Sequence, residues 1–224
     1  PAVALSSLLV VVAQRVRAAR LKSFPLMGHL AAALELAIDV AEGRLPAPAH
    51  VVLPVGSTCT SAGLLVGFAL AATLGVGLPC APRVHSVRIS PWPVTARFRI
   101  RGLAVRTAAY LRSLGGPDLI EAVQSPGALS VSGGLTGGGY GSPSVAGVRA
   151  KAHFAALGAP TLDTTYSAKA AAHLLEGLRP EGPVVFWSTK SSAPLPVANE
   201  STLARLPHRA LRWLDRRHPM DASS

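Results

Sequence analysis

The chain has 224 residues, of which 49% are hydrophobic, so it can bury one substantial core or a core with a small lobe. Its formal net charge is +11, but only four of its 22 basic residues are lysines, and no aromatic residues interleave with the scattered arginines. We therefore expect no nucleic-acid binding, and two cysteines are too few for a metal site or a disulfide framework, which favours a reducing cytoplasm.

The first 22 residues contain an apolar run, VALSSLLVVVAQRV. No basic residue precedes the run, and it is too short to span a bilayer, so we predict a core helix and no membrane association. The chain starts at Pro1 inside this apolar pattern, without an initiator Met or a capping signal. We therefore expect it to be a fragment.

Helix and strand patterns alternate along the rest of the chain. Apolar residues recur at helical spacing, and short β-branched runs separate them. The predicted helices are 28–43, about 60–75, 96–114, 142–158, 167–178 and 201–217; the predicted strands are 49–54, 83–90, 127–132 and a buried one at 182–189. This alternation predicts an α/β fold of three layers, in which a mostly parallel sheet has helices on both faces.

A small polar turn, Gly56-Ser57-Thr58-Cys59-Thr60, joins the first predicted strand to a long apolar helix. Ligands of open α/β sheets bind beyond the carboxyl ends of strands. The first turn of a helix has unpaired N–H groups and a positive dipole end, so this turn can bind a phosphate. The alternative is that one of its hydroxyl residues merely caps the helix. It is neither a Walker loop nor a dinucleotide fingerprint, and the seven histidines lack metal-ligand spacing, so no metal site is predicted.

Four stretches of the chain carry a family resemblance when they are taken together. VVLPVGSTCTSAGL, GGGYGSPS, LDTTYSAKAAAHLL and VVFWSTKSSAPLP occur in the order and at the spacing seen in the 1-aminocyclopropane-1-carboxylate (ACC) deaminase and D-cysteine desulfhydrase family. SFPLMGHLAAALELA at 23–37 also resembles a segment of these enzymes. The resemblance implies the fold type II, tryptophan-synthase-β-like architecture, pyridoxal 5'-phosphate as the cofactor, a small amino acid as the substrate and, for a complete protein, a homodimer.

The resemblance also implies roles for individual residues. The turn from Gly56 to Thr60, Cys59 included, corresponds to the cradle for the cofactor phosphate. Tyr140 and Tyr166 match two family tyrosines that lie beside cofactor and substrate and recognise the carboxylate or transfer a proton. A tyrosine acting as a base needs a pKa lowered from about 10; the alternative for each is a core ring with its hydroxyl at the edge. Ser167 and Thr189 are the candidates for a hydrogen bond to the pyridine nitrogen, and a hydroxyl there favours elimination from a β-substituted amino acid over ring opening.

Three departures from the family pattern suggest relaxed or altered chemistry. Cys59 stands where the phosphate loop commonly has Gly, so a side chain is present where close backbone approach is expected. The family's aromatic-His-Thr strand end is Trp187-Ser188-Thr189 here. Its Tyr-Thr/Glu-Gly-Lys is Tyr166-Ser167-Ala168-Lys169.

The largest departure is the missing lysine region. Enzymes of this family carry the lysine that binds the cofactor covalently in an Asn-Lys stretch near the N-terminus, followed by a small domain with a Ser-Asn-His loop. Neither stretch occurs in this sequence, and none of Lys22, Lys151, Lys169 and Lys190 matches that lysine. Residues 1–224 are therefore expected to be the C-terminal portion of the large cofactor-binding domain, without the lysine stretch and the small domain.

Two functional hypotheses of different class follow. The first is a pyridoxal-phosphate-dependent lyase or deaminase for a small amino acid such as D-cysteine or ACC, inactive as this fragment because the lysine is the covalent anchor and the base at the substrate α-carbon. The second is a non-catalytic truncated homologue that binds a phosphate-bearing ligand or a partner chain.

Overall fold

The computed structural model of the chain describes residues 26–189, 201 and 205–209. The chain divides into two units, Pro1–Ser191 and Ser192–Ser224. In the second unit, the described residues 201 and 208–209 are helical. The predicted N-terminal helix and most of the predicted helix 201–217 lie outside the described residues.

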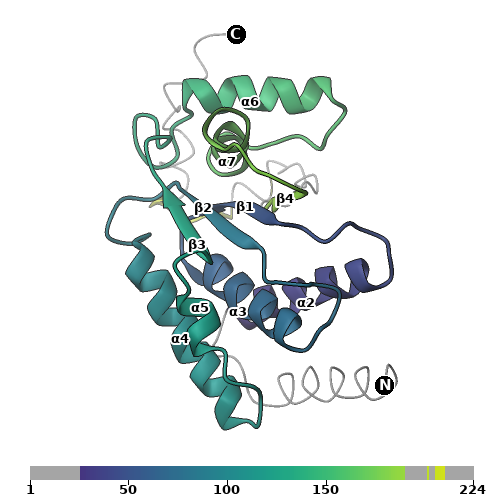
Figure 1. Cartoon of the computed structure of the whole chain (residues 1–224). Helices are drawn as coiled ribbons and strands as arrows, with labels where there is room; N and C mark the ends of the chain where they lie inside the picture. The colour runs from purple at the N-terminus through teal and green to yellow at the C-terminus, as the bar shows by residue number, and fades with distance from the viewer. Residues whose placement is uncertain (1–25, 190–200, 202–204, 210–224) are drawn as a thin grey trace. The chain divides into compact units, whose positions relative to one another are not determined.

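The first unit is built on a four-stranded sheet in which all neighbouring strands are parallel (Figure 1). Its strands are β1 (His50–Val55), β2 (Arg83–Arg88), β3 (Leu129–Ser132) and β4 (Val184–Phe186), in the spatial order β3-β2-β1-β4. Val55 pairs with Arg88, so the carboxyl ends of β1 and β2 lie side by side. This shared edge is where an open parallel sheet binds its ligand.

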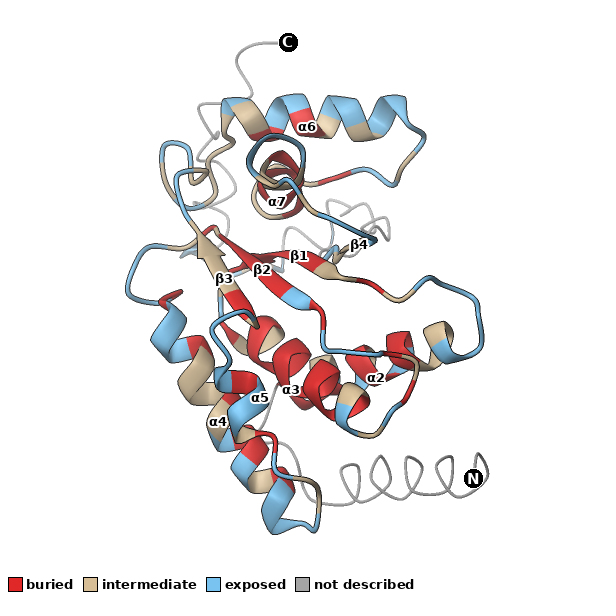
Figure 2. Ribbon diagram, in the orientation of Figure 1, coloured by how far each residue is buried: buried red, intermediate tan, exposed pale blue. Residues whose placement is uncertain are grey.

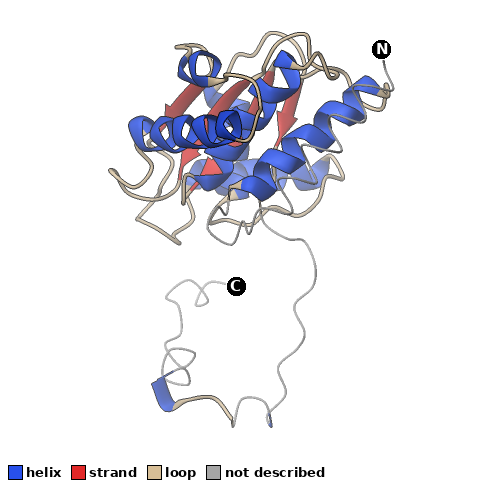
Figure 3. Ribbon diagram, turned by 90° about the horizontal axis from the view of Figure 1, so that it is seen from below, coloured by secondary structure: helices blue, strands red, loops and turns tan. Residues whose placement is uncertain are grey.

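Helices cover both faces of the sheet (Figure 1; Figure 3). One face carries α2 (Met27–Ala41), α3 (Cys59–Thr73), α4 (Arg97–Ser113) and α5 (Ile120–Gln124). The other face carries α6 (Val145–Ala156) and α7 (Ser167–Ala172), which continues into a π-helical turn, η2 (His173–Gly177). The prediction of a three-layer α/β fold with a parallel sheet is confirmed.

The core lies between the sheet and α3 (Figure 2). Every residue of α3 from Ser61 to Ala71 is buried, and so are residues 51–55 of β1. A helix that is apolar on all sides is stable only when other elements surround it. Here the sheet, α2 and α4 surround α3, so the turn that precedes it is held by the most buried part of the unit.

Two glycines let α2 approach α3 closely. A Cβ on Gly63 would lie 2.5 Å from the carbonyl oxygen of Leu26, and a Cβ on Gly67 would lie 2.6 Å from the Cβ of Ala33. Neither position has room for a side chain, so the backbones meet directly. This contact fixes α3, and therefore the start of α3, against α2.

The structure contains one helix that the sequence does not predict, and two predicted elements differ in extent. The unpredicted helix is α5, whose five residues are too few to show a helical period. The predicted helix 167–178 is α-helical only to Ala172. The predicted buried strand 182–189 is the three-residue strand β4; it is half-buried because, among the described strands, it lies at the edge of the sheet with β1 as its one neighbour.

Candidate functional site

The turn Gly56–Thr60 connects the carboxyl end of β1 to the first residue of α3. Thr58 is the N-cap residue and has φ +69°, in the left-handed region that a β-branched residue rarely adopts. No side chain caps the helix. The capping alternative from the sequence therefore does not describe this turn, and its hydroxyl groups are not used to satisfy the start of α3.

The start of α3 presents backbone donors at the edge of the sheet. The N–H of Ala62 bonds the carbonyl of Thr58 at 3.0 Å and closes the first turn. The N–H groups of the residues before it precede the intrahelical ladder, as at the start of any helix. Together with the positive end of the helix dipole, they make this point suited to an anion.

A cleft of about 470 Å³ opens beside this turn. It is lined by residues from five separate segments: Pro54, Val55, Gly56, Ser57, Thr58, Thr60, Ser90, Val94, Tyr140, Tyr166 and Thr189. Seven of the nine residues that the sequence singled out are among them. The structure thus brings the polar turn, both tyrosines and the residue after β4 to one place, although they are up to 133 positions apart in sequence.

Cys59 and Ser167 are the two candidate residues that do not line the cleft. Cys59 packs against the hydrophobic core, so its side chain does not occupy the space where a ligand would approach the turn. Ser167 is buried, and its hydroxyl donates to Oδ2 of Asp163 at 2.7 Å. Ser167, a candidate partner of the pyridine nitrogen, therefore does not line this cleft, because the Asp163 carboxylate holds its hydroxyl; its role at that nitrogen stays a prediction.

Tyr140 and Tyr166 contact each other through their hydroxyl groups, which form a hydrogen bond. The two rings are edge to face, with centroids 6.2 Å apart and an interplanar angle of 85°. The hydrogen bond to Tyr140 and, after it, burial raise the pKa of Tyr166 above its ordinary value. A tyrosine in this environment holds its proton at neutral pH, so it is suited to donate a proton rather than to accept one.

Asp163 sets the position of Tyr166. Its Oδ1 accepts the N–H groups of Thr165 at 3.0 Å and Tyr166 at 2.7 Å, and its Oδ2 accepts the N–H of Ser167 at 3.0 Å. Burial works to raise the pKa of Asp163, but the hydrogen bonds from Ser167, Tyr166 and Thr165 outweigh it and lower the pKa. The carboxylate therefore stays charged and anchors the start of α7.

Sequence reasoning missed Ser90, Val94 and Asp163. Ser90 and Val94 line the cleft from the segment between β2 and α4, which contains no motif. Asp163 did carry a signal, since Asp-Thr-Thr shortly before a helix is a typical start, and its side chain bonds the backbone N–H groups that follow.

The lysines do not enter the cleft within the described residues. Neither Lys151 nor Lys169 is among the lining residues, and Lys169 donates from Nζ to the carbonyl of Thr136 at 2.9 Å. Lys22 and Lys190 lie outside the described residues. In the same described part of the chain, no group of three His, Cys, Asp or Glu side chains is arranged to hold a metal ion, and no helix is long and apolar enough to cross a membrane.

Comparisons with known proteins bear on the fold and on the resemblance. No protein-family model matches the chain. The chain is 35% identical over 167 residues to the nocardicin C-9' epimerase of Nocardia uniformis subsp. tsuyamanensis, a region that covers 74% of this chain and 46% of the epimerase. It also matches the crystal structure of an ACC deaminase homologue with a TM-score of 0.52 and 19% identity, over 72% of this chain and 44% of that one.

The chain thus spans less than half the length of both of these proteins. The structural comparison shows that the chain shares the α/β fold of the ACC deaminase homologue.

Proposed function

We propose that the chain is the C-terminal portion of the large, cofactor-binding domain of a fold type II pyridoxal-phosphate enzyme related to ACC deaminase and D-cysteine desulfhydrase, and that the whole enzyme acts on a small amino acid. The observation that carries the proposal is the convergence of the four motif-bearing stretches, around Gly56, Tyr140, Tyr166 and Thr189, on one cleft at the carboxyl ends of β1 and β2. Four weak motifs would not be expected to meet at one place unless they served one ligand.

The residues of the cleft fit the cofactor. The backbone N–H groups at the start of α3 and the hydroxyls of Ser57 and Thr58 are donors for a phosphate, and no side chain caps the helix in their place. The hydroxyl of Thr60 also lines the cleft, where it is hydrogen-bonded to Nε2 of His29 at 3.1 Å. Thr189 offers a hydroxyl from the end of the segment after β4. When bound, pyridoxal phosphate supplies an electron sink for the carbanion of an amino acid.

Epimerisation is a second candidate reaction, favoured by the 35% identity to nocardicin C-9' epimerase. Elimination and epimerisation both begin with removal of a proton from carbon, and they differ in whether a group leaves or a proton returns. Tyr166 holds its proton at Oη beside the cleft. A protonated tyrosine is the kind of group that returns a proton to a carbon centre.

The proposal is tested by titrating the chain with pyridoxal phosphate and, separately, with pyridoxal, which lacks the phosphate. We expect pyridoxal phosphate to bind at least about tenfold more tightly, because the start of α3 provides fixed donors for the phosphate. Ser57→Asp places a negative charge in the turn and should abolish this difference. Ser125→Asp is the matched control, since Ser125 is also exposed but lies at the end of α5 and not in the cleft.

Equal affinity for the two compounds, or an unchanged difference in Ser57→Asp, would refute the proposal. Borohydride reduction of the mixture and peptide mapping then test whether a described lysine of this chain anchors the cofactor. We expect no pyridoxyl adduct at Lys151 or Lys169 and negligible release of sulfide or ammonia from D-cysteine. An adduct at either lysine together with turnover would show that a described lysine is the anchor.

A further inference from the structure

Lys169 is a charged residue in an apolar position. Its side chain is fully buried in α7, among alanines that pack against the sheet and α6. Burial lowers its pKa, and the nearby Asp163 carboxylate acts in the opposite direction. Burying an ammonium group is costly unless it is paired or hydrogen-bonded. A methionine would fill the same space without that cost. Packing alone therefore does not account for the ammonium group at this position.

The ammonium group donates from Nζ to the backbone carbonyl of Thr136 at 2.9 Å. Thr136 belongs to the glycine-rich loop 133–143, which connects β3 to α6 and carries Tyr140. Four glycines of this loop have positive φ, and a Cβ on Gly137 would lie 2.4 Å from the carbonyl oxygen of Pro143. Such a loop has many accessible conformations when unfolded, so contacts from outside must select one.

Two hydrogen bonds tie this loop to α7 and to the residue before it. Lys169 donates to the carbonyl of Thr136, and Tyr166, the N-cap residue of α7, bonds Tyr140. Leu135 of the loop also packs against the apolar clusters that contain the alanines of α7. The hydrogen bonds within the loop, from Gly139 to Thr136 at 3.4 Å and from Ser142 to Gly139 at 3.2 Å, are longer than the 2.9 Å bond from Lys169. Lys169 therefore directs where Thr136, and with it Tyr140, lies.

We propose that Lys169 is a positioning residue whose ammonium group fixes the carbonyl of Thr136 and thereby holds Tyr140 against Tyr166 at the wall of the cleft. A catalytic role for the Tyr140–Tyr166 pair rests on the proposed function. The position of the pair in the structure does not depend on that function. Lys169 acts through the loop and does not line the cleft. A positioning role therefore accounts for a buried lysine that is not the covalent anchor of the cofactor.

The experiment compares Lys169→Met with the unchanged chain, without any cofactor. The substitution removes a buried charge and keeps the side-chain length, and such replacements are often neutral or stabilising, so the variant is expected to fold. The tyrosinate absorbance is titrated with pH, and subtraction of the Tyr166→Phe titration isolates Tyr166. Because the Tyr140 hydrogen bond raises the pKa of Tyr166, we expect this pKa to fall in Lys169→Met by at least half of the fall measured in Tyr140→Phe.

Hydrogen exchange provides the second readout. Amides of 133–141 should exchange at least about tenfold faster in Lys169→Met, while those of α6 should not change. Lys151→Met is the matched control, because Lys151 is a partly exposed lysine on α6 and should leave both readouts unchanged. Lys169→Leu, which also lacks a donor, gives the same comparison if the methionine variant does not fold.

The direction of the change separates positioning from electrostatics. If Lys169 acted only as a nearby positive charge, its removal would raise the pKa of Tyr166, because a cation favours tyrosinate. A raised or unchanged pKa in a folded variant, or unchanged exchange of the loop, would overturn the proposal. Since neither readout involves pyridoxal phosphate, this failure is distinct from a failure to bind the cofactor.

Discussion

Thr58 adopts a backbone conformation that its own side chain disfavours. A positive φ costs a β-branched residue about 1–2 kcal/mol, and such residues persist only where the surrounding structure holds them. Here β1 precedes the turn and the fully buried helix α3 follows it. The conformation places Thr58 at the wall of the cleft, next to the first N–H groups of the helix. The turn is thus held in shape before any ligand arrives.

Asp163 is the residue whose loss should loosen Tyr166 most directly. Its carboxylate accepts three backbone N–H groups and one hydroxyl at the start of α7. We expect Asp163→Ala to lower the free energy of unfolding by about 1–2 kcal/mol, the usual cost of removing a side chain that satisfies the start of a helix. Urea-induced unfolding followed by circular dichroism measures this loss.

Asp39→Ala is the matched control for that substitution. Asp39 pairs with Arg44 on the surface, where an exposed ion pair contributes at most about 1 kcal/mol. If Asp163→Ala costs no more than Asp39→Ala, the hydrogen bonds at the start of α7 do not stabilise the fold as argued.

The packing of α2 on α3 depends on Gly67. A Cβ there would lie 2.6 Å from the Cβ of Ala33 and 2.7 Å from the carbonyl oxygen of Leu30, closer than real contacts allow. We expect Gly67→Ala to destabilise the chain by about 2 kcal/mol or more, because two backbones would have to move apart. The midpoint of thermal unfolding reports the loss.

Gly102→Ala provides the comparison on α4. The nearest atom to an added Cβ there is Nη1 of Arg106 at 3.6 Å, the end of a flexible side chain. Alanine in the interior of a helix is then favoured over glycine by about 0.5–1 kcal/mol. The two substitutions should thus shift the unfolding midpoint in opposite directions; a fall of equal size in both would contradict the proposed role of the close approach.

Elements with a strong local pattern were predictable from the sequence. The helices α2, α3 and α4 and the strands β1, β2 and β3 agree with the predicted ranges within about four residues, because each contains enough apolar residues to show its period. The helix α5 is too short to do so. The half-burial of β4 depends on which strands lie beside it, and no local pattern records that.

The candidate site was predictable where a motif carried it. Tyr140, Tyr166 and the turn at Gly56 stand in recognisable stretches, and all line one cleft. Ser90 and Val94 could not be found because their position follows only from the path of the loop between β2 and α4. Ser167 does not line the cleft because its hydroxyl donates to Asp163, a contact that the spacing of residues does not reveal.

At the scale of the whole molecule, a hydrogen-bonded chain of polar groups ties three strands together. The backbone carbonyl of Glu181 can only accept, so Nε2 of His50 donates to it at 3.1 Å. When His50 is neutral, its Nδ1 then accepts from Nε2 of His85 at 2.9 Å. Nδ1 of His85 accepts in turn from the hydroxyl of Ser130 at 2.8 Å. The chain cannot form when both histidines are charged, because two N–H groups would then face each other between the rings.

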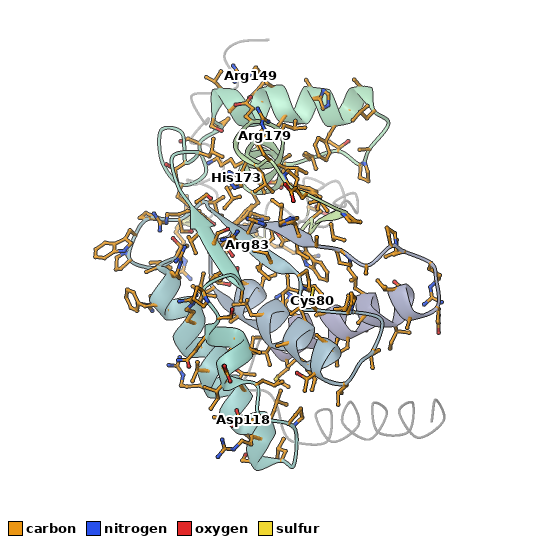
Figure 4. The ribbon with its side chains drawn as sticks, in the orientation of Figure 1. Cys80, Arg83, Asp118, Arg149, His173 and Arg179 are labelled. Atoms are coloured by element: carbon orange, nitrogen blue, oxygen red, sulfur yellow. The ribbon has the colours of Figure 1, made fainter. Side chains whose placement is uncertain are left out.

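Acid should therefore weaken the fold through His85. Burial first, and then the charges of His50, Arg83 and His173, lower its pKa from 6.5 to about 4; Arg83 and His173 are labelled in Figure 4. Between these two values the unfolded chain binds a proton at His85 and the folded chain does not. The free energy of unfolding thus falls as the pH is lowered from 6.5 to about 4, by on the order of 2 kcal/mol after allowance for solvent screening.

Urea unfolding across this pH range tests the expectation, with His85→Gln as the diagnostic variant. The variant should be less stable than the unchanged chain near neutral pH, because it loses the contacts to His50 and Ser130, but its stability should depend less on pH. A residual slope is expected, because burial lowers the pKa values of His29 and His173 in the same direction. His153→Gln, at an exposed position on α6, should keep the full slope. An equally steep loss of stability in His85→Gln would show that His85 does not couple protonation to the unfolding of the sheet.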